Sequence, residues 1–128
     1  MRTIYTATFI QEDNTFYARI PDLPGCITTG EDLPDAIEQI TDAANLWLVT
    51  AEDHGDPIPA PTPQSKLDHP DDAILTMIQV DTIAYRSAID TRAVRKNVSL
   101  PAWMANLADQ RGINCSQVLQ EGLLQKLA

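Results

Sequence analysis

The sequence is poor in the residues that build metal sites, disulfide frameworks and membrane spans. Only two cysteines and two histidines occur among its 128 residues. Cys26 and Cys115 lie in different segments, and with His54 and His69 they show no spacing typical of zinc ligands. There is no charged-then-apolar signal at the N-terminus and no apolar run close to the length of a membrane span. We therefore expect a cytoplasmic protein that binds no metal and no cofactor.

Basic residues are also scarce, and they are unevenly distributed. The formal charge is −9, yet residues 1–90 carry four Lys/Arg against sixteen Asp/Glu, whereas residues 91–128 carry five against two. The first part therefore has a net charge of −12 and the second a net charge of +3. Such a division favours a polyanionic partner for the C-terminal part and a basic protein for the N-terminal part, although acidity alone also serves solubility.

The first 30 residues predict a small antiparallel sheet. Residues 3–11 are rich in β-branched and aromatic types, residues 12–14 form an acidic turn, and residues 15–20 resume the strand pattern, which together indicate a hairpin. Residues 26–29 make a third short strand that ends at Gly30.

A long helix and a fourth strand should complete this part of the chain. Asp32 is a suitable N-cap, and apolar residues then recur at steps of three and four up to Leu48, which predicts an amphipathic helix that stops near Gly55 and packs on the sheet. Residues 56–70 hold five of the nine prolines, so we expect an extended loop there. Residues 74–80 resemble a strand that returns to the same sheet. A short helix from about residue 81 to 89 and a hinge at 90–93 would follow.

The last 38 residues predict a strand and two helices that cannot bury their own apolar face. In residues 94–100 Arg95, Asn97 and Ser99 share one face, whereas Val98 and Leu100 share the other. Two copies of such a strand would form an antiparallel ribbon, which fits the major groove of DNA. The pattern is typical of a dimeric ribbon-helix-helix protein, and the alternative for the polar face is simple solvation.

Capping residues delimit the two helices. Pro101 suits a first helical position and Gly112 a helix stop. Asn114 is expected to cap the second helix, with Gln117 as its reciprocal partner. The backbone N–H groups of Asn114, Cys115 and Ser116 would then form an anion site suited to a DNA phosphate.

The N-terminal residues resemble the HicB antitoxins of type II toxin–antitoxin systems. The resemblance is carried by Tyr5-x-Ala7-x-Phe9, by the acidic hairpin turn, and above all by the run Pro-Asp-Leu-Pro-Gly-Cys at residues 21–26 with the following Thr28-x-Gly30. Two residues depart from the family pattern. Pro34, in the run Glu31-Asp32-Leu33-Pro34, stands where the family more often has an acidic residue. Lys96 stands where the family usually has an apolar residue.

The resemblance implies an α+β protein: a partial ribonuclease-H-like β-β-β-α-β domain over residues 1–90, then a ribbon-helix-helix β-α-α dimerisation domain over residues 91–128. The first domain would neutralise HicA, a small basic mRNA interferase with a fold like that of double-stranded-RNA-binding domains. The second would repress the shared operon by binding operator DNA as a homodimer. Pairing of dimers into tetramers through their N-terminal domains is left open by the sequence.

Acidic residues at turns and at the helix start are then candidates for toxin binding, and polar ribbon and helix-start residues are candidates for DNA binding. The toxin-facing candidates are Glu12, Asp13, Asp22, Glu31, Asp32 and Asp35; the DNA-facing candidates are Arg95, Asn97, Ser99, Asn114, Cys115 and Ser116.

Two other functions remain open from the sequence. One is a solitary DNA-binding regulator whose N-terminal domain senses a small molecule, which the presence of a neighbouring gene for a short basic protein would argue against. The other is a metal-dependent nuclease, which would need several carboxylates converging on metal ions. The acidic residues of this chain lie mostly in turns and helix starts, so we expect a protein without catalytic activity.

Overall fold

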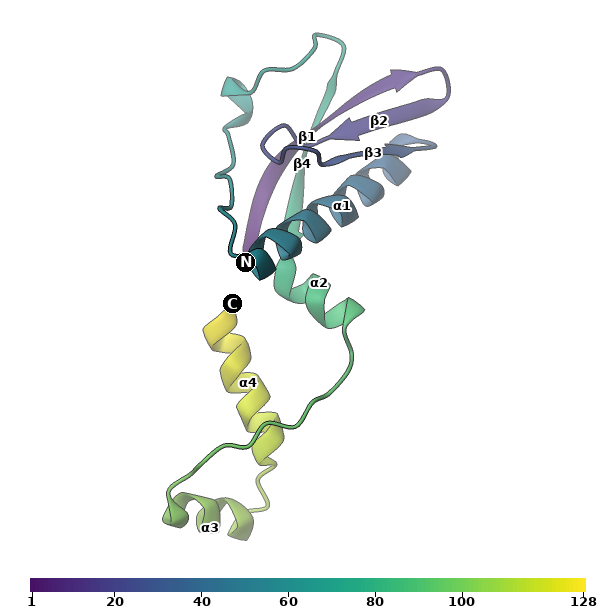
Figure 1. The fold of residues 1–128 in the computed structure, drawn as a ribbon. Helices are drawn as coiled ribbons and strands as arrows, with labels where there is room; N and C mark the ends of the chain where they lie inside the picture. The colour runs from purple at the N-terminus through teal and green to yellow at the C-terminus, as the bar shows by residue number, and fades with distance from the viewer. The chain divides into compact units, whose positions relative to one another are not determined.

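Two long runs of β-branched and aromatic residues form the hairpin that begins the fold. In the computed structural model, which describes residues 1–128, β1 (Arg2–Glu12) pairs antiparallel with β2 (Thr15–Arg19). Asp13 in the connecting turn has a φ of 55°, a left-handed conformation that Asp tolerates better than most residues. β3 (Ile27–Gly30) and β4 (Ile74–Asp81) complete a four-stranded antiparallel sheet in the order β3-β2-β1-β4 (Figure 1).

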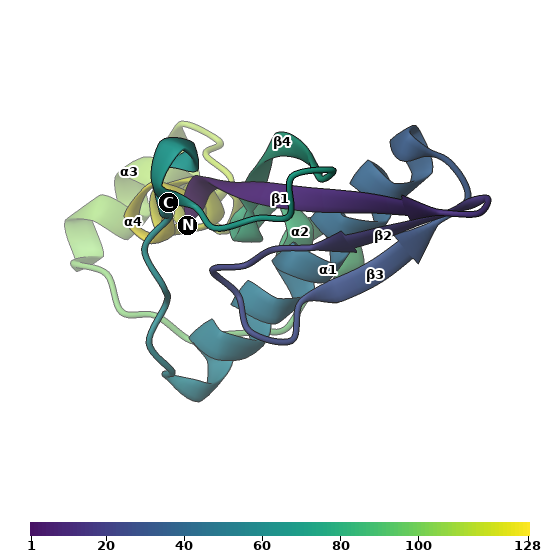
Figure 2. The same cartoon turned by 90° about the horizontal axis from the view of Figure 1, so that it is seen from above.

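The helix α1 (Leu33–His54) covers one face of this sheet (Figure 2). Its buried residues recur on one stripe, which packs against the inward side chains of the strands. The side chain of Asp32 caps its start, and Gly55 ends it in a left-handed conformation with φ 69°. The largest fully buried side chains of the first unit are Tyr5, Phe9, Ile20, Leu23, Ile40, Leu48, Val80 and Thr82.

Gly30 allows α1 to approach the sheet closely. A Cβ atom built on Gly30 would lie 2.4 Å from the backbone nitrogen of Ala36 and 2.8 Å from its Cβ. Real side chains do not tolerate such distances, so only glycine fits where β3 ends and α1 begins. The Thr-x-Gly element of the sequence therefore has a packing role.

The proline-rich segment runs in an extended course from the end of α1 back to β4, interrupted by a short 3-10 helix at Gln64–Lys66. Near its start the segment is anchored to the sheet, because the hydroxyl of Tyr5 in β1 donates a hydrogen bond of 2.6 Å to the carbonyl oxygen of Pro59. Further along, Asp68 and Pro70 line a small pocket of about 120 Å³ together with strand residues. The segment thus belongs to the N-terminal fold, as the returning strand predicted.

Three shorter helices follow the sheet. α2 (Thr82–Ile89) continues directly from β4, and α3 (Ala102–Gln110) and α4 (Cys115–Leu127) lie in the last part of the chain. The chain divides into two compact units, Met1–Ala88 and Ile89–Ala128. None of the helices is both long enough and apolar enough to cross a bilayer.

The predicted α+β class and the β-β-β-α-β order of the first unit are confirmed, with strand ends that differ by one or two residues. Two details of the C-terminal part differ from expectation. Pro101 stands just before α3, as its N-cap with a ψ of 139°, and is not its first helical residue. Residues 90–101 contain no helix or strand in the single chain, so the ribbon expected at 94–100 stays a prediction.

Candidate interaction surfaces

The sheet register gathers most of the predicted toxin-facing acids at one end of the first unit. Gln11 pairs with Phe16, and Phe16 in turn pairs with Gly30, so the β1–β2 turn lies beside the start of α1 (Figures 1 and 2). We call this region the acidic end; it contains Glu12, Asp13, Glu31, Asp32 and Asp35.

Two of these five acids also stabilise the start of α1. Asp32 Oδ1 accepts a hydrogen bond of 2.8 Å from the backbone N–H of Asp35, and Asp35 Oδ2 accepts one of 2.9 Å from the backbone N–H of Glu31. This arrangement resembles the capping box, in which two side chains satisfy helix-start N–H groups. The carboxylates of Glu12, Asp13 and Glu31 make no hydrogen bond within the chain, so they are the ones fully available to a partner.

Asp22 lies at the opposite end, in the loop that follows β2, and holds the proline-rich segment. Its Oδ2 accepts a hydrogen bond of 2.8 Å from the backbone N–H of Thr62, and its Oδ1 accepts one of 2.6 Å from the hydroxyl of Thr62. Burial, followed by the negative charge of Asp22, raises the pKa of Tyr5, which keeps the Tyr5 hydroxyl protonated as a donor. The structure therefore separates Asp22 from the other five acids and gives it a role in the fold.

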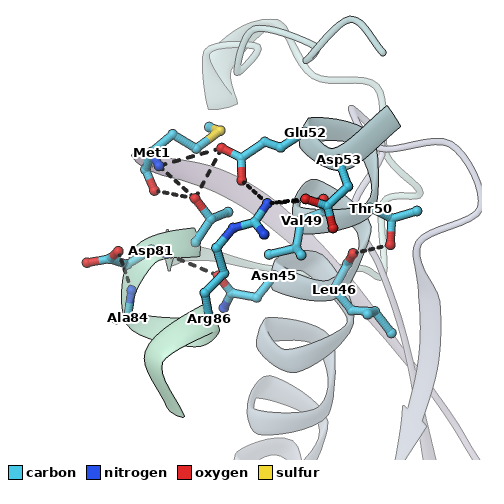
Figure 3. A network of polar contacts seen from close by, with 11 residues as sticks. Met1, Asn45, Leu46, Val49, Thr50, Glu52, Asp53, Asp81, Ala84 and Arg86 are labelled. Atoms are coloured by element: carbon cyan, nitrogen blue, oxygen red, sulfur yellow. Dashed lines mark hydrogen bonds and ion pairs between the residues drawn. The ribbon is translucent and has the colours of Figure 1, made fainter. Parts of the chain in front are cut away.

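A second polar network binds α2 to the end of α1 (Figure 3). The guanidinium of Arg86 donates to Asp53 Oδ1 at 2.8 Å and to Glu52 Oε1 at 3.3 Å. The hydrogen bond to Asp53 is the largest of the effects that raise the pKa of Arg86. The N-terminal ammonium group of Met1 donates to the hydroxyl of Thr82 at 2.6 Å. This network fixes the point at which the chain leaves the first unit.

Sequence reasoning did not find the Arg86 network. Its partners are more than 30 positions apart in the chain, and only the fold brings them together. The one available signal was a basic residue in the predicted short helix and an acidic pair at the end of the predicted long helix, which is too common a pattern to identify a contact.

The second unit exposes nearly all of its large apolar side chains. Within Ile89–Ala128 only Ala108 is buried. An apolar cavity of about 290 Å³ opens between the residues before α3 and the two helices, with Val98, Leu100 and Leu119 among its lining residues. A segment of this size that buries so little apolar surface cannot be stable alone, so it needs a second apolar surface to cover it. The exposed large apolar side chains are Ile89, Val94, Val98, Leu100, Trp103, Met104, Leu107, Ile113, Val118, Leu119, Leu123, Leu124 and Leu127.

The predicted DNA-facing residues of the ribbon are exposed in the single chain. Arg95, Asn97 and Ser99 all face solvent. Arg95 and Asn97 line a surface hollow of about 500 Å³ together with Lys96 and Ser116 from the start of α4. The structure thus places the first two ribbon residues beside the predicted anion site.

The start of α4 is capped by only half of the predicted reciprocal pair. Asn114 Oδ1 accepts a hydrogen bond of 3.1 Å from the backbone N–H of Gln117, as expected. The side chain of Gln117 does not return the bond, because its Nε2 donates to Glu121 Oε1 at 3.2 Å. The backbone N–H groups of Asn114, Cys115 and Ser116 have no acceptor within the chain, and they remain available to an anion.

The side chains that could ligate a metal ion are dispersed, and one of the two cysteines is buried. No group of three or more His, Cys, Asp or Glu side chains is arranged to hold a metal ion. Cys26 is buried, and burial raises the pKa of its thiol to about 11, so it stays protonated at neutral pH and is a poor nucleophile. The polar groups of this chain either support the fold or point outward.

A sheet backed by one long helix, joined to a helical unit with an uncovered apolar face, defines a two-part binding protein. The family model described as the HicB-like antitoxin of bacterial toxin–antitoxin systems matches residues 5–128. The chain therefore belongs to the HicB-like antitoxins, a family of antitoxins and not of enzymes.

Individual proteins of known sequence or structure also match the chain. A UPF0150 protein of Synechocystis sp. is 40% identical over 45 residues, which are 35% of this chain and 62% of that protein, so the chain spans less than two thirds of that relative. A toxin–antitoxin complex from Streptococcus pneumoniae matches with a TM-score of 0.63 and 20% identity, covering 98% of this chain and 99% of that one. A HicA3 and HicB3 toxin–antitoxin complex matches with a TM-score of 0.52 and 24% identity, covering 62% and 99%. At such identities the solved structures establish the fold.

Proposed function

We propose that this chain neutralises a HicA-type toxin through residues 1–90 and represses its own operon through residues 91–128, which bind operator DNA as a homodimer. The observation that carries the proposal is the family match, which runs through both units of the chain. The opposite charges of the two parts support it, because a net −12 suits a basic toxin and a net +3 suits DNA.

The acidic end is our candidate for steering the toxin. Glu12, Asp13 and Glu31 project from two neighbouring turns, and their carboxylates are exposed and unpaired within the chain. Charges at the rim of an interface mainly set the rate of encounter and its salt dependence. Asp32 and Asp35 add to the negative electrostatic potential of the acidic end, and they also cap α1.

The test replaces Glu12, Asp13 and Glu31 together by their amides in the full-length protein. We expect the association rate with a catalytically inactive HicA-type toxin to fall about tenfold at low salt, with a small change in the dissociation rate. A matched control replaces Asp42, Asp56 and Asp68, which removes the same charge elsewhere on the unit. If wild-type protein does not bind the toxin, the neutralising function is wrong; if both triple variants slow association equally, the acidic end is not the site.

On the DNA side, Arg95, Asn97 and Ser99 would project from the paired ribbon into the major groove. Arg can bind guanine and Asn can bind adenine through two hydrogen bonds each. The free N–H groups at the start of α4 would clamp a phosphate and contribute affinity without sequence information. Changes in the ribbon should therefore alter base preference, whereas changes at the start of α4 should weaken binding to every sequence.

The test is an anisotropy titration of the protein's own promoter DNA at one fixed salt concentration. Arg95→Ala should weaken operator binding by about 1–3 kcal/mol and remove the base preference at one position in each half-site. Ser116→Glu should weaken binding to all sequences, because its carboxylate repels the phosphate. Toxin binding should survive both changes. Wild-type affinity of Arg95→Ala for the operator would mean that the ribbon does not read the bases.

A further inference from the structure

β4 is an edge strand whose outer side has no partner. It lies at one end of the order β3-β2-β1-β4. The backbone N–H of Thr82 donates to the carbonyl oxygen of Met1 at 2.9 Å, which sets the alternation of hydrogen-bonded pairs along the β1–β4 ladder. Thr76, Ile78 and Val80 therefore bond to β1. The backbone groups of Leu75, Met77 and Gln79 point away from the sheet, and the outer edge of β4 consists of these three residues.

This outer edge has a defined end and carries none of the usual protection. The backbone N–H of Asp81 also points outward, but it donates to the side chain of Asn45 at 3.1 Å, so further pairing stops there. Between Ile74 and Val80 the strand has no charge, no proline and no bulge, the features by which natural edge strands avoid pairing with other chains. The side chain of Met77 is 59% exposed and that of Leu75 is half-buried, so two of the three edge residues are apolar.

The other edge of the sheet is less suitable for pairing. On β3 the backbone groups of Cys26, Thr28 and Gly30 face β2, as the bond from the N–H of Ile20 to the carbonyl oxygen of Cys26 shows. Only Ile27 and Thr29 then present backbone groups outward, which leaves room for one short pairing.

We propose that the outer edge of β4 is extended by a β-strand of the basic toxin, which adds a fifth strand to the sheet. This inference rests on the function proposed above and names its mode of contact. Charge selects the occupant: a second copy would bring another −12 against the same edge, whereas a basic chain is attracted to it. The exposed acids Asp71 and Asp72, just before the strand, add to that attraction. Backbone hydrogen bonds would supply affinity, and Met77 would supply apolar contact.

The experiment compares edge prolines in the full-length protein. Met77→Pro removes an N–H that faces outward, so the ladder with β1 keeps its bonds while an added strand loses a donor and meets the proline ring. We expect affinity for a catalytically inactive HicA-type toxin to fall at least about tenfold. Met77→Thr keeps the N–H and loses only the apolar side chain, so its affinity should fall less than that of Met77→Pro. Thr29→Pro places a matched proline on the outer edge of β3 and should bind as wild type does.

Hydrogen exchange gives a second readout that does not depend on substitution. The amides of Leu75, Met77 and Gln79 should exchange rapidly in the free protein and be protected in the toxin complex. If wild type binds toxin and Met77→Pro binds equally well, with these amides still exchanging rapidly, the edge is not the docking site, although the proposed function stands. If Met77→Pro changes only the oligomeric state of the free protein, the occupant is a second copy and our inference is overturned. Absence of toxin binding by wild type would instead refute the function itself.

Discussion

Single residues show how much of the acidic surface supports the fold. Of the six acids expected to face the toxin, Asp32 and Asp35 cap α1 and Asp22 holds Thr62. The cap at Asp32 could be predicted, because it depends on residues three positions apart. The bond between Asp22 and Thr62 could not, because 40 positions separate the two residues and only the course of the proline-rich segment brings them together.

Gly30 gives the clearest stability prediction. Gly30→Ala places a methyl group against the backbone of Ala36, which cannot yield without moving α1. We expect the free energy of unfolding of the first unit to fall by about 1–3 kcal/mol. Urea unfolding followed by the fluorescence of Trp47 measures the change, and Thr29→Ala, at an exposed neighbouring position, is the control. Equal stability of the two variants would show that β3 and α1 are less tightly packed than the structure has them.

Cys26 gives a prediction about reactivity. Because burial raises the pKa of its thiol from the ordinary 9.0 to about 11, the thiolate fraction at pH 8 is lower by roughly a hundredfold. In a Cys115→Ser variant the remaining thiol should therefore react very slowly with a disulfide reagent, and should react at once in denaturant. The rate should rise with pH until the thiol ionises near pH 11. Rapid labelling of the native variant at pH 8 would contradict the burial of Cys26.

At the scale of elements, the sequence predicted well those helices and strands that are marked by residues close together in the chain. α1 begins after Asp32 and ends at Gly55, as the caps indicated, and β4 returns to the sheet after the prolines. The strand at 94–100 is the exception, and its physical reason is plain. A β-strand is defined by backbone hydrogen bonds to a neighbouring strand. The neighbour expected for residues 94–100 is the same segment of a second copy, and the single chain does not contain it.

Two side chains of α2, Thr82 and Arg86, bond to α1, and Arg86 makes most of these bonds. Arg86→Ala removes the bonds to Glu52 and Asp53, so we expect the amides of α2 to exchange faster. The loss in global stability should be about 1 kcal/mol or less, because these side chains are partly exposed and such ion pairs are weak. Arg92→Ala breaks the exposed pair with Asp90 and is the matched control. Unchanged exchange in α2 after Arg86→Ala would show that the bonds of Arg86 do not hold the helix in place.

For the whole molecule, we expect assembly to decide whether the second unit folds. The apolar side chains of α3 and α4 have no cover within one chain, so we expect a homodimer at micromolar concentration. Leu119→Asp places a charge among the residues that line the apolar cavity and should yield monomers. Light scattering measures the mass, and Gln117→Asp, on the polar side of α4, is the control. Operator binding should be lost in Leu119→Asp while toxin binding persists; a monomeric wild type would refute the dimer.

The irregular stretch at residues 90–101 bears on how long each activity lasts in a cell. All of these residues are exposed and lie at the start of the second unit, in the kind of backbone that proteases cut first. Dimer formation would shield part of the stretch, so the chance of a cut rises as the chain becomes dilute. A cut there leaves the sheet and α1 whole but detaches α3 and α4. If the proposed division of functions holds, falling abundance would end repression before it ends neutralisation, and synthesis would resume while existing chains still hold the toxin.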